Sequence, residues 1–321
     1  MGVIHMKKFI PAVLVSILSF SAPYALSAES ASFTPNAITA QGAEKVTVKH
    51  LSGETEVVKK PQKVVLFDFG IYDSMQKLGL GDKVVALPMG NAPAYVKAGI
   101  PATVKNAGGM KEPNLAEIAA LKPDLIVITG RQGKSYDALS KIAPTLNLGS
   151  DSKNYVESVK ANIRLIGDLY GDQKAVDEQL AQLDKTIAEA QKKAAASNKK
   201  VLVLLHNDGK LIPNNQAVVY DVVKAQRAEL PVQADADKSK RRVVDTKTIA
   251  QANPDVILIV DRSEAIGAGK LEKTVFEDQN IQETKAYKDG KITYLQSDLW
   301  YLSGGGLVSL TEQIDAVTKA L

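Results

Sequence analysis

Apolar and polar positions follow two different periods along the first part of the chain. The stretches KVTVKHL and GETEVV place apolar residues at every second position and predict a strand, a turn and a strand. The apolar run 63–69 predicts a buried strand, IYDSMQKLGL a helix with apolar residues at helical spacing, and 83–88 another strand. NLAEIAALK then predicts a helix and DLIVIT a strand. Such strand–helix alternation favours a parallel or mostly parallel sheet.

Helical spacing dominates from Tyr155 to about Ala196, with a break at Gly171. The second part of this segment predicts a helix about 36 Å long, at 1.5 Å per residue. A helix of that length between two alternating regions can act as a strut between two lobes.

The alternation resumes after this helical segment. KVLVLL (200–205) predicts a strand, AVVYDVVKAQ and TKTIAQA helices, DVILIV and KITYL (291–295) strands, and residues 307–321 a last helix. We therefore expect an α/β fold with two similar lobes, each a mostly parallel sheet with flanking helices, joined by one long backbone helix.

One unit of this pattern occurs twice, 131 positions apart. Seven residues match in the two copies: Ile118, Ala119, Pro123, Asp124, Ile126, Ile128 and Arg131 recur as Ile249, Ala250, Pro254, Asp255, Ile257, Ile259 and Arg262. In each copy the proline ends a helix, because it lacks an N–H group and restricts the residue before it. The repeat predicts an N-terminal lobe over 29–154, whose first residues (29–44) form a flexible leader, a helical connection over 155–197 and a C-terminal lobe over 198–321.

The first 28 residues have the pattern of a secretory signal peptide. Lys7 and Lys8 precede the apolar run 9–22, and ALSA ends at Ala28, after which we expect cleavage. The run is short for a membrane-spanning helix. The chain contains no cysteine, which excludes disulfides, thiolate metal sites and a lipid-modified cysteine. We therefore expect a periplasmic protein without a lipid anchor.

Charge and motifs argue against several classes of function. Without residues 1–28 the chain has 38 basic against 36 acidic side chains, a net charge of +2, which is small for a nucleic-acid surface. The motifs G-x-S-x-G and H-E-x-x-H are absent. His50 is far in sequence from the candidate site, and His206 follows a predicted strand, where we expect a structural role. Two histidines also argue against a resident zinc or manganese ion. We therefore expect that the protein is not an enzyme and that it has no covalently bound cofactor.

Two arginines are the first candidates for ligand binding. Arg131 and Arg262 each follow a predicted strand of the repeat, and ligands of open α/β sheets bind beyond the carboxyl ends of strands. If the lobes face each other, both guanidinium groups lie in the gap and can clamp an anion. Further cations come from the stretch DKSKRR, a charge run that is also typical of a solvated surface: Lys238, Lys240, Arg241 and Arg242.

The stretch SDLWYLSGGGL is the other distinctive feature. It contains the single tryptophan, Trp300, beside Tyr301. The pair predicts a binding wall or ordinary core packing, and the Tyr301 oxygen could bind a hard metal ion. The glycines permit a tight turn into the last helix. A phosphate cradle lacks support because the Walker lysine pattern is missing.

Together these stretches resemble a known family. KVVLFDFGIYDSMQKLGL, EPNLAEIAALKPDLIVITGR, NPDVILIVDR and DLWYLSGGGL, with the signal peptide and the long helix, are similar to the helix-backbone class of periplasmic binding proteins that serve ABC importers. Within that class they resemble the iron–siderophore binders of the enterochelin/petrobactin group. The resemblance spans nearly the whole chain after residue 28 and implies two lobes joined by a stiff helix, with a shallow cleft between them.

The resemblance also implies roles for individual residues. The binding arginines of the family match Arg131 and Arg262, and a third one falls near Asn215. The tyrosine that coordinates ferric iron matches Tyr301. Its partner histidine aligns with Lys240, which has no lone pair for iron. We therefore expect a siderophore that fills all six iron positions itself, with catecholate favoured and hydroxamate or mixed ligands left open.

The resemblance further implies a partner. Proteins of this family dock on an inner-membrane permease through one acidic residue from each lobe, and here the candidates are Glu112 or Glu117 in the first lobe and Asp245 in the second. We expect a monomer that delivers a ferric siderophore to this permease. The alternatives are the same carrier role for haem or cobalamin and, in another class, a periplasmic α/β hydrolase.

Overall fold

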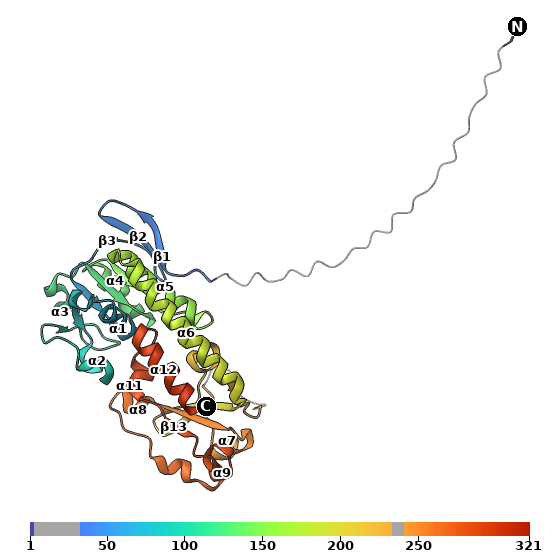
Figure 1. Ribbon diagram of the computed structural model, residues 1–321. Helices are drawn as coiled ribbons and strands as arrows, with labels where there is room; N and C mark the ends of the chain where they lie inside the picture. The colour runs from blue at the N-terminus through green and yellow to red at the C-terminus, as the bar shows by residue number, and fades with distance from the viewer. Residues whose placement is uncertain (3–32, 233–240) are drawn as a thin grey trace. The chain divides into compact units, whose positions relative to one another are not determined.

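The structure is a computed structural model that describes residues 1–2, 33–232 and 241–321 (Figure 1). The predicted signal peptide therefore lies almost wholly outside the described residues, as do Lys238 and Lys240. Residues Pro35–Leu321 form one compact unit, and every element below belongs to it. None of the helices found in the described residues combines the length and apolar character that crossing a bilayer requires.

A five-stranded parallel sheet with the strand order β6-β5-β4-β7-β8 forms the centre of the N-terminal lobe. Its strands are β4 (Val64–Leu66), β5 (Val84–Leu87), β6 (Lys105–Asn106), β7 (Leu125–Ile128) and β8 (Thr145–Asn147). The helices of this lobe are α1 (Phe69–Lys77), α2 (Ala94–Lys97), α3 (Leu115–Leu121) and α4 (Tyr136–Ser140), with short 3₁₀ segments at Gly81–Lys83, Met89–Asn91 and Gly130–Ser135. All pairings in this sheet are parallel, as the strand–helix alternation predicted.

A second, antiparallel sheet precedes this one and corrects the expectation of a flexible leader. It contains β1 (Ala37–Gln41), β2 (Lys45–His50) and β3 (Gly53–Val58) in that order. The prediction of a leader over 29–44 is wrong for β1, whose side chains are mostly exposed and therefore show no apolar period. Pairing with β2, and not its own composition, makes β1 a strand. The buried side chains of β2 and β3 join the N-terminal core.

The C-terminal lobe contains a mixed sheet with the order β10-β9-β12-β13 and with β11 paired to β9. Its strands are β9 (Lys200–Asn207), β10 (Lys210–Pro213), β11 (Gln226–Arg227), β12 (Val256–Asp261) and β13 (Ile292–Tyr294). Only β10 is antiparallel to its neighbour. The helix expected over AVVYDVVKAQ is reduced to a π-helical turn at Val218–Val222, after which the chain enters β11.

Helices cover this sheet and connect the lobes. They are α5 (Tyr155–Tyr170), α6 (Gln173–Ser197), α7 (Thr246–Ala252), α8 (Arg262–Ala265), α9 (Gln279–Gln282), α10 (Lys285–Lys288), α11 (Ser297–Leu302) and α12 (Leu307–Ala320), with a 3₁₀ segment at Lys273–Glu277. The predicted break at Gly171 is confirmed as a left-handed C-cap with φ 75°. The long helix is confirmed as α6, whose buried residues all join the C-terminal core. Its neighbour α5 contributes to both cores, so it ties the two lobes together. The predicted two-lobed α/β fold is confirmed.

The repeat has a structural explanation that its sequence did not reveal. The Asp124 carboxylate accepts hydrogen bonds from the backbone N–H groups of Gln62 and Lys63 (2.7 and 2.9 Å) at the start of the neighbouring strand β4. Asp255 accepts one from Lys200 N (2.8 Å) at the start of β9. In both copies the aspartate after the proline therefore holds the neighbouring strand of the sheet in register.

The glycine run of SDLWYLSGGGL lies where α12 meets α1, and Figure 1 shows the two helices close together. Gly304 and Gly305 have φ 126° and 71°, values that favour glycine. A methyl group on Gly306 would overlap the Asp73 carboxylate and the Gly70 carbonyl. Asp73 accepts hydrogen bonds from Val308 N and Ser309 N (both 3.0 Å), so a side chain of α1 caps the first turn of α12. The glycines thus permit close packing of two backbones.

Candidate functional site

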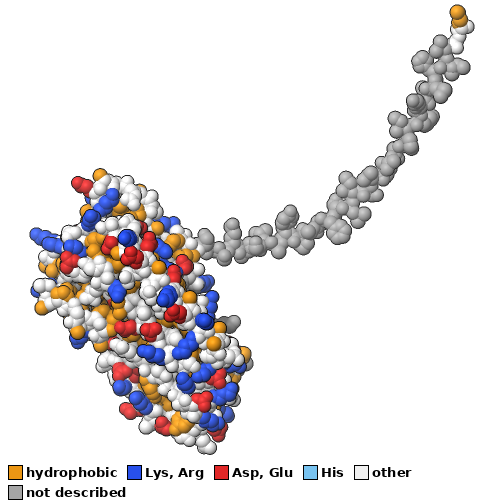
Figure 2. Space-filling model, in the orientation of Figure 1, with side chains coloured by type: hydrophobic (Ala, Val, Ile, Leu, Met, Phe, Trp, Pro, Cys, Tyr) orange, Lys and Arg blue, Asp and Glu red, His pale blue; other side chains and the backbone are white. Residues whose placement is uncertain are grey.

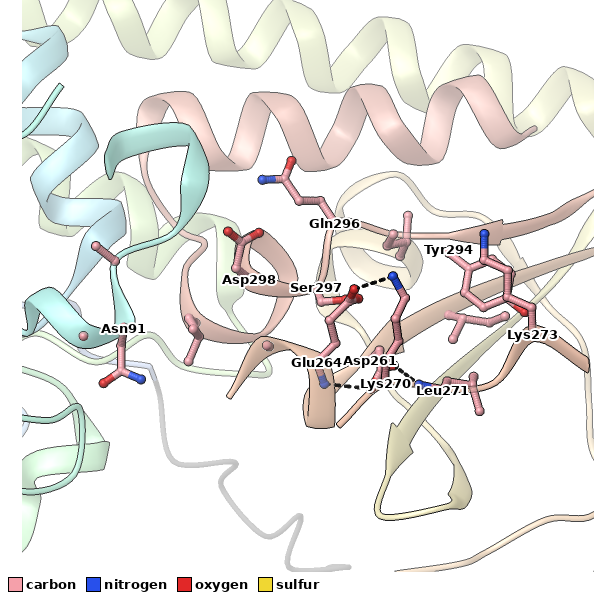
Figure 3. Close-up of a pocket in the computed structure, with 16 residues that line it drawn as sticks. Asn91, Asp261, Glu264, Lys270, Leu271, Lys273, Tyr294, Gln296, Ser297 and Asp298 are labelled. Carbon is pink, nitrogen blue, oxygen red and sulfur yellow. Dashed lines mark hydrogen bonds and ion pairs between the residues drawn. The ribbon is translucent and has the colours of Figure 1, made fainter. Parts of the chain in front are cut away.

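Two cavities lie between the N-terminal and C-terminal lobes, on either side of α11. The larger, about 520 Å³, is lined by residues 90–92 of the first lobe and by β12, α8, β13 and the start of α11 (Figure 3). Two of its charged groups form an ion pair. Lys270 Nζ lies 2.8 Å from Glu264, and Ser297 donates to the same carboxylate (2.6 Å). The buried Asp261 accepts from Leu271 N (2.6 Å). This cavity contains none of the predicted ligand residues.

The second cavity, about 360 Å³, matches the predicted cleft. It lies at the carboxyl ends of β4, β7 and β8 and is closed by α11 and the start of α12. Three of the predicted ligand residues line it, namely Arg131, Trp300 and Tyr301, and a fourth, Arg262, contacts Tyr301 from the C-terminal lobe without lining the cavity. We therefore take this cavity as the candidate ligand site.

Local capping positions Arg131. Thr129 follows β7 and caps the next turn, with its hydroxyl accepting from Arg131 N (3.3 Å). The buried Gln132 accepts from Thr129 N (2.9 Å) and donates to the carbonyl of Met110. From this braced turn the Arg131 guanidinium donates to the Tyr301 carbonyl (2.6 Å) and lies 5.3 Å from the centroid of its ring.

Arg262 approaches the same tyrosine from the second lobe. It is the first residue of α8, which Asp261 caps at the end of β12. Its Nε donates to the Tyr301 hydroxyl (2.8 Å), its Nη1 donates to Asn207 (2.6 Å), and its guanidinium carbon lies 5.5 Å from the ring centroid. The two arginines of the repeat thus converge on one aromatic residue, but only Arg131 of the two lines the cavity.

The lining of the cavity offers a metal ion the phenol oxygens of Tyr301 and Tyr155 and the carboxylate of Asp68. The Tyr301 hydroxyl accepts from Arg262 and keeps a lone pair. Across residues 33–232 and 241–321, histidine, aspartate and glutamate side chains nowhere gather in a group of three or more that could hold a metal ion.

His206 has the structural role expected of it. It is buried, its Nδ1 lies 2.7 Å from the Asp261 carboxylate, and its Nε2 accepts from Gly209 N (3.0 Å). Although burial acts in the opposite direction, hydrogen bonds from His206 and from two backbone N–H groups lower the pKa of Asp261. Both ring nitrogens are occupied, so His206 offers no lone pair to a ligand.

The floor of the cavity contains two buried polar groups without partners. Trp300 is 5% exposed and Gln313 is 3% exposed. Among the described residues, neither the Trp300 indole nitrogen nor the Gln313 carbonyl oxygen has a hydrogen-bond partner. Gln313 Nε2 donates to the Leu299 carbonyl (3.3 Å), which fixes the orientation of its amide. Sequence patterns did not single out Gln313, because it lies on the buried face of an ordinary amphipathic helix.

The cavity also contains an acidic side that the sequence analysis missed. Asp68 lines it at the end of β4 and caps α1 by accepting from Ile71 N (2.8 Å). Burial raises the pKa of Asp68, while hydrogen bonds and Arg131 act against this shift. Tyr155 lines the same cavity, and burial together with the charges of Asp68 and Asp73 raises its pKa. Asp68 follows a predicted strand just as Arg131 does, so its place in the sequence could have identified it as a candidate residue of the cavity.

Other predicted ligand residues are not in the lining of this cavity. The Arg242 guanidinium donates to the Pro231 carbonyl (2.6 Å), and Arg241 is exposed beside it. Asn215 accepts from the Arg227 guanidinium. The geometry of the described residues therefore gives no support to ligand contact by Arg241, Arg242 or Asn215. Lys238 and Lys240 lie outside the described residues.

The predicted docking acids are at the surface. Glu112 and Glu117 are exposed near the start of α3. Asp245 is also exposed, but its carboxylate caps α7 by accepting from Thr248 N (2.8 Å), and the hydrogen bonds to Thr248 lower its pKa. Asn114, 131 positions earlier, caps α3 in the same way. Asp245 therefore has a structural role that its repeat position explains.

Comparisons with known proteins agree with this geometry. The family model described as periplasmic binding protein matches residues 64–299. The chain is 38% identical over 284 residues to the petrobactin-binding protein YclQ of Bacillus subtilis (strain 168). The aligned region covers 87% of this chain and 89% of YclQ. The crystal structure of YclQ superposes with a TM-score of 0.81 over 86% of this chain and 98% of that chain.

Two further solved structures are similar. The iron uptake ABC transporter substrate-binding protein PiuA of Streptococcus pneumoniae is 36% identical with a TM-score of 0.81, covering 88% of this chain and 100% of that chain. The periplasmic catecholate-siderophore binding protein VctP of Vibrio cholerae is 30% identical with a TM-score of 0.75, covering 87% and 100%. With a family model that matches most of its length and relatives above 30% identity, the chain belongs to the periplasmic binding protein family.

Proposed function

We propose that this protein binds a ferric siderophore in the cavity between its lobes and delivers it to an ABC importer. The observation that carries the proposal is the convergence of Arg131 and Arg262 on Tyr301. Guanidinium groups keep their charge at any physiological pH and form strong hydrogen bonds with anionic oxygens. The similarity to proteins named for petrobactin, catecholate siderophore and iron uptake supports an iron chelate as the anion.

The chemistry of the cavity favours a chelate that saturates its own iron. Tyr301, the predicted iron ligand, lines the cavity, and its phenol oxygen already accepts a hydrogen bond from Arg262. A ferric tris-catecholate is a compact trianion that fixed cations can both attract and hold. The buried Trp300 ring contributes apolar wall to such a ligand. Catecholates are therefore the favoured class, with hydroxamate or mixed ligands next.

Export and delivery complete the proposal. The N-terminal pattern of residues 1–28 supports a cleaved signal peptide and a periplasmic protein without a lipid anchor. Exposed Glu112 and Glu117 are the candidate contacts of the first lobe with a permease, and Asp245 is that of the second lobe. The family consists of binding proteins, which supports a carrier that catalyses no reaction. We propose that this carrier acts as a monomer.

The test uses native mass spectrometry and the fluorescence of Trp300 with a panel of ferric catecholate, hydroxamate and citrate complexes, haem and cobalamin. We expect a one-to-one complex with a ferric siderophore. Arg131→Ala and Arg262→Ala should each weaken it at least tenfold, because a charge-assisted hydrogen bond contributes about 1.5–3 kcal/mol. Arg164→Ala, a change at an exposed arginine of α5, should leave the affinity within twofold. Failure of every ferric chelate to bind, or wild-type affinity in both cleft variants, would refute the proposal.

A further inference from the structure

The candidate cavity contains an acidic side chain that an anion-binding site does not need. Asp68 lines the cavity together with Arg131 and Tyr301. One of its oxygens accepts from Ile71 N (2.8 Å). None of the ion pairs between described residues includes Asp68. No ion pair among the described residues therefore neutralises this carboxyl group, although burial raises its pKa and the charge of Arg131 acts against that shift.

Capping alone does not explain an acid at this position. An asparagine caps a helix about as well as an aspartate, and Asn114 caps α3 through its neutral side chain. Two other acidic caps have their charge satisfied elsewhere: Asp261 is bonded to His206 and Leu271 N, and Asp245 is exposed to water. Asp68 is the capping acid that lines the ligand cavity.

The cavity is therefore polarised. The arginines and Tyr301 offer donors and positive charge on the side of β7, α8 and α11. Asp68 and Tyr155 line the side formed by β4, α1 and α5. A purely anionic ligand would gain from the first side and be repelled by the second, since like charges in a partly buried site interact strongly. A ligand that also brings a positive donor would gain from both.

We propose that Asp68 is a specificity residue that selects ferric chelates carrying a protonated amine beside the anionic iron centre. This inference rests on the proposed function and adds the ligand class. The amine would donate to the free oxygen of Asp68 while the chelate oxygens face Arg131 and Arg262. Amine-free chelates bind less tightly because the carboxylate then loses water without gaining a partner.

The test is the substitution Asp68→Asn, which keeps the shape and the helix cap and removes only the charge. Two probes are compared by titration at neutral pH: a ferric tris-catecholate without an amine, and the same tris-catecholate with one protonated amine on its backbone. We expect the variant to bind the amine-free probe about threefold to tenfold more tightly, and the amine-bearing probe more weakly by a similar factor. Asn114→Asp, which adds an acidic cap outside the cavity, should change neither affinity by more than twofold.

The outcomes separate the two proposals. Wild-type protein that binds neither probe nor any other chelate of the panel overturns the proposed function and this inference together. Wild-type protein that binds them, with an Asp68→Asn variant that leaves both affinities unchanged or shifts both in the same direction, overturns the role of Asp68 alone. A thermal melt of the variant within a few degrees of the wild type confirms that the cap is retained.

Discussion

The close contact between α1 and the glycine run leads to a sharp prediction about stability. In the substitution Gly70→Ala, the new methyl group would overlap the Gly304 carbonyl oxygen and lie 2.8 Å from Gly306 N. These neighbours are backbone atoms, which cannot rotate away as a side chain would. The α1 helix must therefore move away from the start of α12.

The magnitude follows from what this movement disturbs. Overpacking of a tight interior costs about 1–3 kcal/mol. The same movement weakens the Asp73 cap of α12, and loss of a cap costs about 0.5–2 kcal/mol. We expect Gly70→Ala to lower the free energy of unfolding by about 2–4 kcal/mol. The variant should also bind ligand more weakly, because Tyr301 is three residues before Gly304.

Urea unfolding followed by circular dichroism measures this loss. The matched control is Gly133→Ala, because a methyl group there meets no atom within 4 Å and the residue does not have a positive φ. This control should be neutral or more stable by up to about 1 kcal/mol, since alanine restricts the unfolded chain. If Gly70→Ala were as stable as Gly133→Ala within about 0.5 kcal/mol, the close-packing interpretation of the glycine run would be wrong.

Two further predictions concern pH and the repeat. His50 is buried, and this burial lowers its pKa below the ordinary 6.5. Its Nδ1 accepts from Ser52 N and Asn147 N (both 3.2 Å). The folded state therefore binds the proton less readily than the unfolded state, and stability should be full above pH 6.5 and fall as the pH drops toward the folded pKa. Thermal melts from pH 7.5 to 5 should show this fall in the wild type and less of it in His50→Gln; identical slopes would contradict it. Asp124→Ala should cost about 2 kcal/mol, because two N–H groups at the start of β4 lose a charged acceptor. If urea unfolding gave this variant a free energy of unfolding within about 0.5 kcal/mol of the wild type, the two hydrogen bonds to Asp124 would contribute little to stability.

Local sequence patterns were sufficient to predict the strands and helices that bury one face or both faces. The apolar runs of β4, β7, β9 and β12 and the helical spacing of α5 and α6 all appear where the patterns predicted them. Patterns failed for β1, β11 and the turn at Val218–Val222. These segments are short or mostly exposed, so their conformation depends on partners that are distant in the chain.

The sequence by itself determined the two-lobed α/β fold, the repeat and the placement of two arginines beyond strand ends. These features follow from local periodicity and from the rule that parallel strands end at one edge. Tertiary structure alone decided that both arginines meet at Tyr301, that Asp68 enters the same cavity and that the glycines join α1 to α12. Such contacts depend on how separate elements pack against one another. The spacing of residues along a single element does not determine that packing.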